Sequence, residues 1–359
     1  MASKTTKKML REYVEQAPAP GFLAGFFQSP PENYHTSEKV EFDVERDGED
    51  VAIVLHDRRA KGRKNESTLY TNKEFTPPVY KEEATVPAYS LLDRSAGDSP
   101  YVEPNYNDAA VRRALGVFRK LEKKIYRGVE VQGSQVLQTG KLDLKDASGT
   151  SLYGVDFKPK STHFPTVATS WGAAGAKPID DLESLADVIL QDGKVEASRV
   201  VLGRKALLAF LADEQVQNLL DNRRMNLGQV GRPEVRGNGG RYHGDISVGQ
   251  WTFEIWSYAA GYIDPQTGTF KKYVGDDNVV MLGDGRLDLT FGAVPRIGSP
   301  DARALPFLPA RMSNGGRSYD MHPNAWIEPD GESLTLSVAA RPMCIPTAID
   351  AFGCLDTTA

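Results

Sequence analysis

The chain has 359 residues, of which 40% are hydrophobic and 25% charged, the composition of an ordinary globular protein of about two domains. With 43 basic and 48 acidic residues the net charge is −5, which argues against a protein built mainly to grip nucleic acid. Two cysteines, Cys344 and Cys354, are too few for a disulfide scaffold. We find no secretory signal and no stretch of roughly 18 apolar residues, so we expect a soluble intracellular protein without a membrane span.

Residues 1–46 are predicted to form an arm with a short helix and little core of its own. Beyond it, residues 51–87 form a long, charged excursion with two predicted strand runs, 51–55 and 75–80. The segment between these runs, residues 57–66, contains almost nothing apolar. Because a two-stranded ribbon is marginal in water, we expect this excursion to lie on its own domain or on a neighbouring subunit.

Residues 105–132 are predicted to form one uninterrupted amphipathic helix, roughly 40 Å long, that serves as a spine. Pro104 and Asn105 or Asn107 supply a start signal, and Gly133 is the predicted stop. The apolar stripe recurs at steps of three and four and comprises Val111, Leu115, Phe118, Leu121, Ile125 and Val129. Basic residues fill the rest: Arg112, Arg113, Arg119, Lys120, Lys123 and Lys124.

Residues 136–158 alternate in hydrophobicity around a turn at 146–149, which predicts a hairpin beside the spine helix. Residues 161–177 are rich in Thr, Pro, Ala and Gly and are predicted to be a connector. From there the pattern is α/β. We expect a helix capped by Asp180, a strand at 200–202, and a helix starting at Asp213.

Further strands are predicted at 251–258 and 279–282, with a hairpin turn at 264–268 between them. The glycine-rich segment 236–244 is not a phosphate-binding loop, because no Gly-Lys-Ser/Thr sequence ends it and no helix is predicted to follow. We interpret it as a mobile loop.

Catalytic and metal-binding signals are weak. The histidines, which are predicted to be surface or packing residues, stand far apart without the spacing of a helical metal pair: His35, His56, His163, His243 and His322. The acidic pairs at 180–181 and 276–277 are explained by helix capping and by a turn. We therefore expect no enzyme activity, no cofactor and no metal.

The order and spacing of several segments resemble the major capsid (major head) proteins of tailed bacteriophages with the Hong Kong 97 fold, and most closely the lambda type. The resemblance runs nearly end to end. The segments that carry it are 21–27, 36–41, 74–80, 179–183, 199–202, 204–210, 278–283, 333–338 and 341–346.

The resemblance implies an α+β, Hong Kong 97-like capsid fold with an arm that reaches across to neighbouring subunits. It divides the chain into an N-terminal arm at 1–46, an extended β-hairpin loop at 47–90, a peripheral domain with its spine helix at 91–160, an axial domain at 161–320, and C-terminal strands at 321–359. These last strands would return through the peripheral domain to the axial domain.

The resemblance also implies a function: assembly, as hexamers and pentamers, into an icosahedral head shell that encloses double-stranded DNA without binding it specifically. Implied partners are a scaffolding protein, a portal and a small decoration protein, and assembly would take place in the host bacterial cytoplasm. Two alternatives remain open from the residues alone. One is a phage tail or baseplate protein, and the other is an α+β hydrolase.

The candidate site is a set of contacts between subunits. The basic loop tip, Arg58, Arg59, Lys61, Arg63 and Lys64, is either a solvated turn or a docking tip for acidic residues of the arm, for example Glu41 and Asp43. Phe75 and Tyr80, where the loop returns, complete the candidate set. Covalent crosslinks of the kind found in some relatives are not expected, because the sequences around Lys64, Lys73, Asn314 and Asn324 do not match that pattern.

Overall fold

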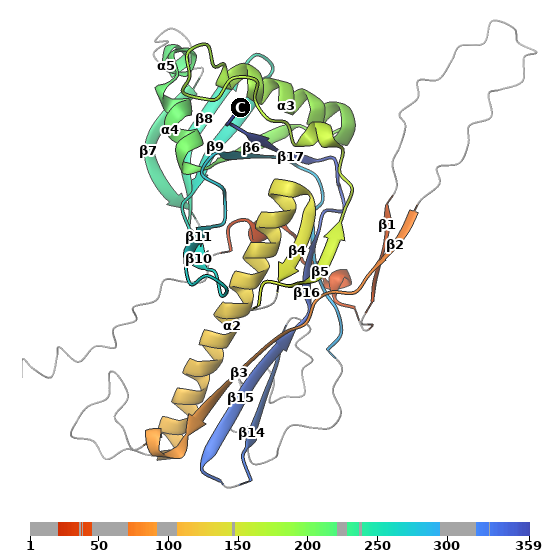
Figure 1. The fold of residues 1–359 in the computed structure, drawn as a ribbon, viewed down its shortest axis with the longest axis vertical. Coiled ribbons are helices and arrows are strands. Elements are labelled where there is room, and N and C mark those ends of the chain that lie inside the picture. Colours follow the sequence, from red (N-terminus) through yellow and green to blue (C-terminus); the bar gives the residue numbers. More distant parts are fainter. Residues whose placement is uncertain are drawn as a thin grey trace, which may run out of the picture.

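The computed structural model describes residues 21–35, 37, 39–44, 71–91, 106–145, 148–220, 228–236, 239–294, 321–329 and 331–359. Helix α2, Tyr106–Thr139, runs along one unit of the molecule and ends beneath a second unit (Figure 1). At 34 residues it is longer than predicted, about 50 Å. The predicted stop at Gly133 was wrong, because the helix continues to Gly140, whose φ of 64° suits a helix end.

A three-stranded antiparallel sheet packs against the N-terminal half of α2. Its order is β14-β15-β3, from His322–Ile327, Ser333–Ala340 and Tyr80–Pro87. The central part of the predicted apolar stripe faces this sheet, because its side chains form one buried cluster with residues of the strands: Phe118, Leu121, Ile125, Val86, Leu336 and Val338. Val129 of the stripe packs in a different cluster.

The predicted strand at 75–80 was wrong. Phe75 ends β2, Thr71–Phe75, which pairs antiparallel with β1, Val40–Val44. Residues 76–79 have no regular structure, and Tyr80 begins β3. Pro77 and Pro78 explain the break, since proline has no backbone N–H to donate to a strand. The other predicted run, residues 51–55, lies outside the described residues.

The second unit is built on a six-stranded sheet of order β17-β12-β6-β9-β8-β7. Neighbouring strands are antiparallel except for β6 and β9, which are parallel. The strands are β6 Ala197–Leu202, β7 Gly228–Arg236, β8 Gly240–Val248, β9 Trp251–Tyr258, β12 Asn278–Gly283 and β17 Phe352–Asp356.

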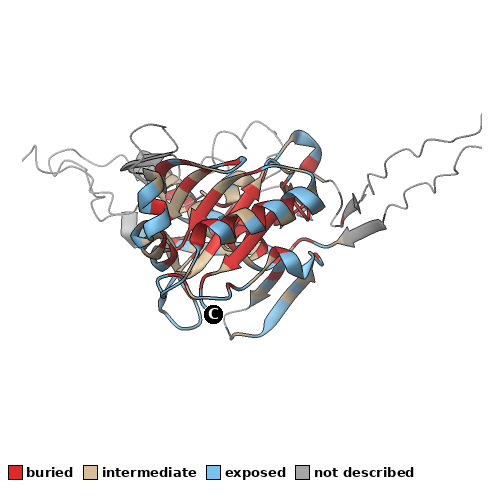
Figure 2. Cartoon of the chain, turned by 90° about the horizontal axis from the view of Figure 1, so that it is seen from above, coloured by how far each residue is buried: buried red, intermediate tan, exposed pale blue. Residues whose placement is uncertain are grey.

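Three helices belong to this second unit: α3 Pro178–Gly193, α4 Arg204–Ala212 and α5 Glu214–Leu220. Figure 2 shows buried residues on the strands and on the inward sides of the helices, with the outward sides exposed. Asp180 was wrongly predicted to cap α3. Pro178 starts that helix and the Asp180 carboxylate accepts from Lys177 Nζ at 2.9 Å. The start at Asp213 is confirmed, because its Oδ1 accepts from the backbone N–H of Gln215 and Val216.

The interpretation of 236–244 as a mobile loop was wrong. β7 ends at Arg236, β8 begins at Gly240, and these two residues are partners in an antiparallel hairpin. Gly239 has a φ of 95°, which glycine adopts without strain, so this residue suits the turn that leads into β8.

The remaining strands form three short two-stranded pairs. β4 Lys141–Lys145 pairs with β5 Ser151–Asp156, and β10 Gly261–Ile263 pairs with β11 Phe270–Lys272, so both predicted hairpins are confirmed. β13 Asp288–Phe291 pairs with β16 Pro342–Ile345. Short 3-10 helices lie at Ala24–Phe26 (η1), Pro31–Asn33 (η2), Ala88–Leu91 (η3) and Ser161–His163 (η4).

A second apolar cluster lies between α3, α4 and the six-stranded sheet, and a third joins the two units. The third cluster contains side chains of the N-terminal segment, the C-terminal half of α2 and strands of both units, for example Leu23, Phe27, Val136, Leu282, Met343 and Phe352. The two cysteines, Cys344 and Cys354, are buried in this cluster and form no disulfide.

Candidate assembly surfaces

The N-terminal segment is anchored to α2 by a buried carboxylate. The backbone N–H groups of Leu23 and Ala24, at the start of η1, donate to the two oxygens of Glu130, each at 2.9 Å. Burial raises the pKa of the Glu130 carboxyl, and these two donors partly oppose that shift. Burial, followed by the nearby Glu130 carboxylate, also raises the pKa of Tyr258. Glu130 thus joins the N-terminal segment to the spine helix.

A second anchor lies at β13. Asn33 Nδ2 donates to Asp288 Oδ1 at 3.0 Å, and Arg286 Nε donates to Asp288 Oδ2 at 2.9 Å. The Tyr34 ring stacks on Phe291 at 5.2 Å. Residues 21–35 therefore pack on their own subunit, and residues 1–20 of the expected arm lie outside the described residues.

The structure places the sequence-predicted contact residues in three situations. Arg58, Arg59, Lys61, Arg63 and Lys64 lie outside the described residues. Glu41 and Asp43 lie in β1, opposite Glu74 and Asn72 of β2, and only their backbone is described. Figure 1 shows the β1–β2 ribbon standing off to the side of both larger sheets.

Phe75 and Tyr80 contact their own subunit at the base of this ribbon. The Phe75 ring lies 5.7 Å from that of Phe157. The Tyr80 hydroxyl accepts a hydrogen bond from Gln132 Nε2 at 2.8 Å, and burial raises its pKa to about 12. Both side chains fix where the ribbon leaves the body, a role that the sequence did not reveal.

The β10–β11 hairpin carries an exposed apolar pair that sequence reasoning missed. Ile263 and Phe270 are directly opposite in the register and are 70% and 61% exposed. Asp264 holds the turn, since its carboxylate accepts from Lys271 Nζ at 2.6 Å and from the Gln266 N–H at 3.0 Å. A rigid hairpin that presents two large apolar side chains is typical of a protein contact rather than of a solvated turn.

Catalytic chemistry finds little support in the described part of the chain. His163, which is fully buried, contacts the Phe352 carbonyl through Nδ1 at 2.9 Å and Asp192 Oδ2 through Nε2 at 3.2 Å. It ties η4 to β17 and to the end of α3, as a packing histidine would. Among the described residues, no three His, Cys, Asp or Glu side chains come together as a metal site.

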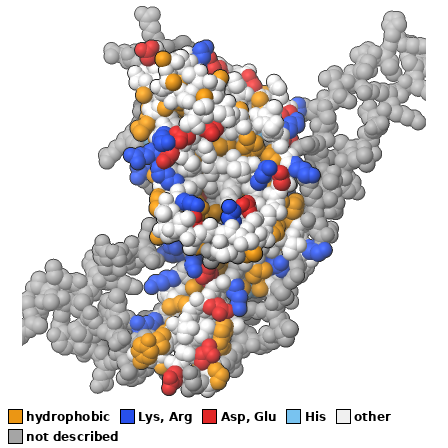
Figure 3. Space-filling view, in the orientation of Figure 1, with side chains coloured by type: hydrophobic (Ala, Val, Ile, Leu, Met, Phe, Trp, Pro, Cys, Tyr) orange, Lys and Arg blue, Asp and Glu red, His pale blue; other side chains and the backbone are white. Residues whose placement is uncertain are grey.

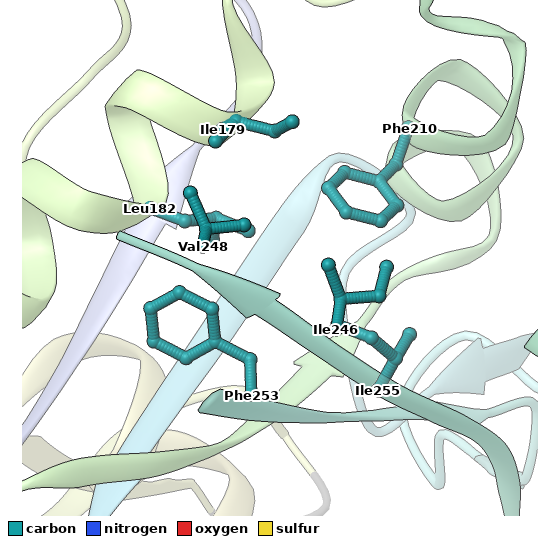
Figure 4. Close-up of a pocket in the computed structure, with 7 residues that line it drawn as sticks. All are labelled: Ile179, Leu182, Phe210, Ile246, Val248, Phe253 and Ile255. Carbon is teal, nitrogen blue, oxygen red and sulfur yellow. The ribbon is translucent and has the colours of Figure 1, made fainter. Parts of the chain in front are cut away.

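A small pocket lies where α3 and α4 face strands β8 and β9 (Figure 4). All of the side chains that line it are apolar: Ile179, Leu182, Phe210, Ile246, Val248, Phe253 and Ile255. Acid–base or nucleophilic catalysis needs titratable groups at the reacting centre, and this lining offers none.

Within the described ranges, no helix has the length and apolar character needed to cross a bilayer.

Comparison with known proteins identifies the class. The family described as "Phage major capsid protein E" matches residues 5–353, so the chain belongs to that family. Its function is to form the shell of a phage head, and its α+β fold is Hong Kong 97-like, as the sequence predicted. The tail, baseplate and hydrolase alternatives do not fit this assignment. No curated protein matches the chain.

Two solved structures share the fold. One is a protein from E. coli CFT073 described as a prophage capsid protein, with 18% identity, a TM-score of 0.64, and coverage of 96% of this chain and 94% of that one. The other is a phage-related protein from Bordetella bronchiseptica RB50, with 12% identity, a TM-score of 0.52, and coverage of 99% and 97%.

Proposed function

We propose that the chain assembles, as hexamers and pentamers, into an icosahedral shell that encloses the double-stranded DNA of a tailed phage, in the cytoplasm of the host bacterium. The observation that carries this proposal is the β1–β2 ribbon beside a body with three buried clusters. Because an isolated two-stranded ribbon is marginal, such a ribbon is completed by packing on another subunit. Many copies of one chain can then be linked while each body stays rigid.

We assign the parts of the chain to shell roles as follows. The six-stranded unit, built from residues 161–320 and completed by β17, is the axial domain that meets its copies around the five-fold and six-fold axes. The unit of α2 and β14-β15-β3 is the peripheral domain, with residues 91–160 as its first part and 321–359 returning through it. Residues 1–46 are the arm and 47–90 the extended loop. The last strand, β17, lies at the edge of the six-stranded sheet beside β12, which supports this C-terminal path.

Contacts between subunits use both charge and apolar surface in this proposal. The basic tip Arg58, Arg59, Lys61, Arg63 and Lys64 docks near acidic residues such as Glu41 and Asp43, which sets register more than affinity. The exposed pair Ile263 and Phe270 supplies apolar area at a second contact. Shell strength comes from repeating such contacts around each ring.

We further propose that the chain has no catalytic role and works with other head proteins. A scaffolding protein directs its assembly, a portal occupies one vertex, and a small decoration protein binds over the peripheral domain and loop. The apolar pocket, and the structural contacts of His163, support the absence of catalysis.

The experiment is to replace residues 57–66 with a short Gly-Ser turn and to compare this variant with the wild type, each co-expressed with the head-assembly proteins. We expect the wild type to give closed shells and the variant to give a folded subunit, by circular dichroism and sedimentation, that forms no shells. Normal shells from the variant would contradict the role of the loop. An unfolded variant would contradict the claim that the body is independent of it.

A further inference from the structure

The solvent-facing side of α2 is basic along the N-terminal half of the helix. Arg119 and Lys120 are exposed, and Lys123 and Arg127 are partly exposed. At 100° per residue these four positions fall on one face, opposite the buried stripe that packs on the sheet. We call them the basic face. Figure 3 shows Lys and Arg side chains along the lower part of the molecule, where α2 runs, together with acidic and hydrophobic side chains.

The segregation of charge on this helix is unusual for the chain. Residues 111–128 contain seven Lys or Arg residues and one acidic residue, Glu122, although the whole protein has more acidic residues than basic ones. A face kept basic only for solubility would mix both signs, as the chain as a whole does. The bias in this segment therefore indicates a partner with the opposite charge.

The cations of the basic face also lack the local partners that other surface lysines have. Lys141, Lys177 and Lys205 each lie within 3.0 Å of a carboxylate, those of Asp156, Asp180 and Asp277. On α2 itself, Lys124 pairs with Glu82 of β3. Within the described part of the chain, Arg119, Lys120, Lys123 and Arg127 make no ion pair, so their donors are available to an external anion.

The chemistry of the face fits a regularly charged polyanion. Residues three or four positions apart on a helix lie about 5–6 Å from each other, so a row of cations on a rigid helix can meet successive phosphates. Arginine donates to phosphate oxygens in a bidentate fashion, and lysine adds point charge. Tyr126, which is 40% exposed, lies beside these cations, so the face carries one large aromatic neighbour in a row that is otherwise basic.

We propose that the basic face of α2 lies on the inner side of the shell and contacts the phosphate backbone of the packaged double-stranded DNA, without reading its sequence. This inference rests on the proposed function, because it needs a DNA-filled shell. The net charge of −5 makes each contact weak, so the contact positions DNA against the wall rather than gripping it.

The test is a quadruple variant, Arg119→Gln, Lys120→Gln, Lys123→Gln and Arg127→Gln, measured for binding of a short random-sequence DNA duplex to the purified subunit at several salt concentrations. The matched control removes four other surface charges: Lys141→Gln, Lys145→Gln, Lys177→Gln and Lys205→Gln. We expect the slope of log affinity against log salt to shrink by about 3 to 4 in the α2 variant and to stay at the wild-type value in the control.

Three outcomes overturn the inference: wild-type protein that does not bind the duplex at low salt, an α2 variant with an unchanged slope, or a control that loses as much as the variant. A polyglutamate peptide is the second probe. Binding of this peptide as tight as that of DNA, with the same loss in the variant, would assign the face to an acidic protein segment instead.

Orientation is tested on assembled empty shells with an amine reagent too large to pass through the wall. We expect Lys120 and Lys123 to be labelled in free subunits and protected in shells. Labelling in intact shells would place the face outside and contradict the inference. Failure of the wild type to form shells would contradict the proposed function itself, whereas shells with unchanged DNA binding would contradict this inference alone.

Discussion

The backbone N–H of Leu23 donates to Glu130 Oε1 at 2.9 Å, although the two residues are 107 positions apart. Leu23 is fully buried, and so is the carboxylate that it meets. A short helix begins at this point, and its first N–H groups have no partners within the helix. The contact therefore gives the N–H groups of the N-terminal segment an acceptor and the buried carboxylate of α2 two donors. It also fixes the path of the segment across the body.

Glu130→Ala is expected to destabilise the subunit, because it leaves the buried N–H of Leu23 and the part-buried N–H of Ala24 without an acceptor. Each such group costs about 1–3 kcal/mol. Urea unfolding of the variant and the wild type measures the difference. A matched substitution at the exposed Lys120, to Ala, should change the free energy of unfolding by less than about 0.5 kcal/mol. Equal stability of Glu130→Ala and wild type would show that the anchor contributes nothing.

The pH dependence of the same site has a defined sign. Because the folded-state pKa of Glu130 is raised above its ordinary value of 4.5, the folded state binds the proton more tightly than the unfolded state. Its contribution to stability is fully present below the unfolded pKa and is lost as pH rises through the raised folded pKa. The stability of the wild type relative to Glu130→Gln should therefore fall as pH rises over this window. A difference that is constant with pH would contradict the shift.

Gly203 and Gly116 offer a contrast between a crowded and an open glycine. A Cβ at Gly203 would lie 2.0 Å from the Gly275 carbonyl oxygen, whereas one at Gly116 meets nothing within 4 Å. We expect Gly203→Ala to cost at least about 2 kcal/mol, as overpacking against backbone does. Gly116→Ala should stabilise α2 by about 0.5–1 kcal/mol. Thermal unfolding of both variants checks the prediction. A melting temperature of Gly203→Ala equal to that of the wild type would contradict it.

The exposed pair on the β10–β11 hairpin should be needed for assembly but not for folding. The double variant Ile263→Ser and Phe270→Ser removes apolar area that is already in water, so circular dichroism should match the wild type. Sedimentation should show subunits instead of shells. Leu208→Ser, on α4 and 59% exposed, is the control that should still assemble. Normal shells from the double variant would show that the hairpin is not needed as a contact between subunits.

Mature particles should dissociate into single chains when boiled in detergent. The segments around Lys64, Lys73, Asn314 and Asn324 do not match the pattern of covalently crosslinked relatives, so the shell is expected to be held by non-covalent contacts and a decoration protein. One gel band near the chain mass of 39.4 kDa is the expected result. A ladder of covalent multimers would refute it.

The sequence was sufficient for features that depend on local periodicity. The stripe Phe118, Leu121 and Ile125 predicted α2 and the side that faces the sheet, and Asp213 predicted the start of α5. The end of α2 could not be predicted, because Gly133 is kept small by packing against Phe27, a contact distant in the chain. In sequence, a glycine that ends a helix cannot be distinguished from a glycine that leaves room for a neighbouring side chain.

The candidate contacts were harder to predict, since exposure and long-range pairing are properties of the fold. Glu130 directly follows Val129 of the buried stripe. Its place in the sequence could therefore have suggested that its carboxylate is buried. In sequence, Ile263 and Phe270 are ordinary strand residues. Only the register of the hairpin shows that the two side chains are directly opposite, and only the fold shows that they are exposed. Phe75 and Tyr80 were chosen as contacts between subunits, whereas the structure shows each contacting its own body.

This chain forms the wall of a phage head. The most direct measurement is an electron cryomicroscopy reconstruction of particles from cells that express the chain with its head-assembly partners. We expect closed icosahedral shells in which the six-stranded unit surrounds the five-fold and six-fold axes and the β1–β2 ribbon lies on a neighbouring subunit. Helical tail-like tubes without closed shells, or a subunit that stays monomeric under these conditions, would contradict it.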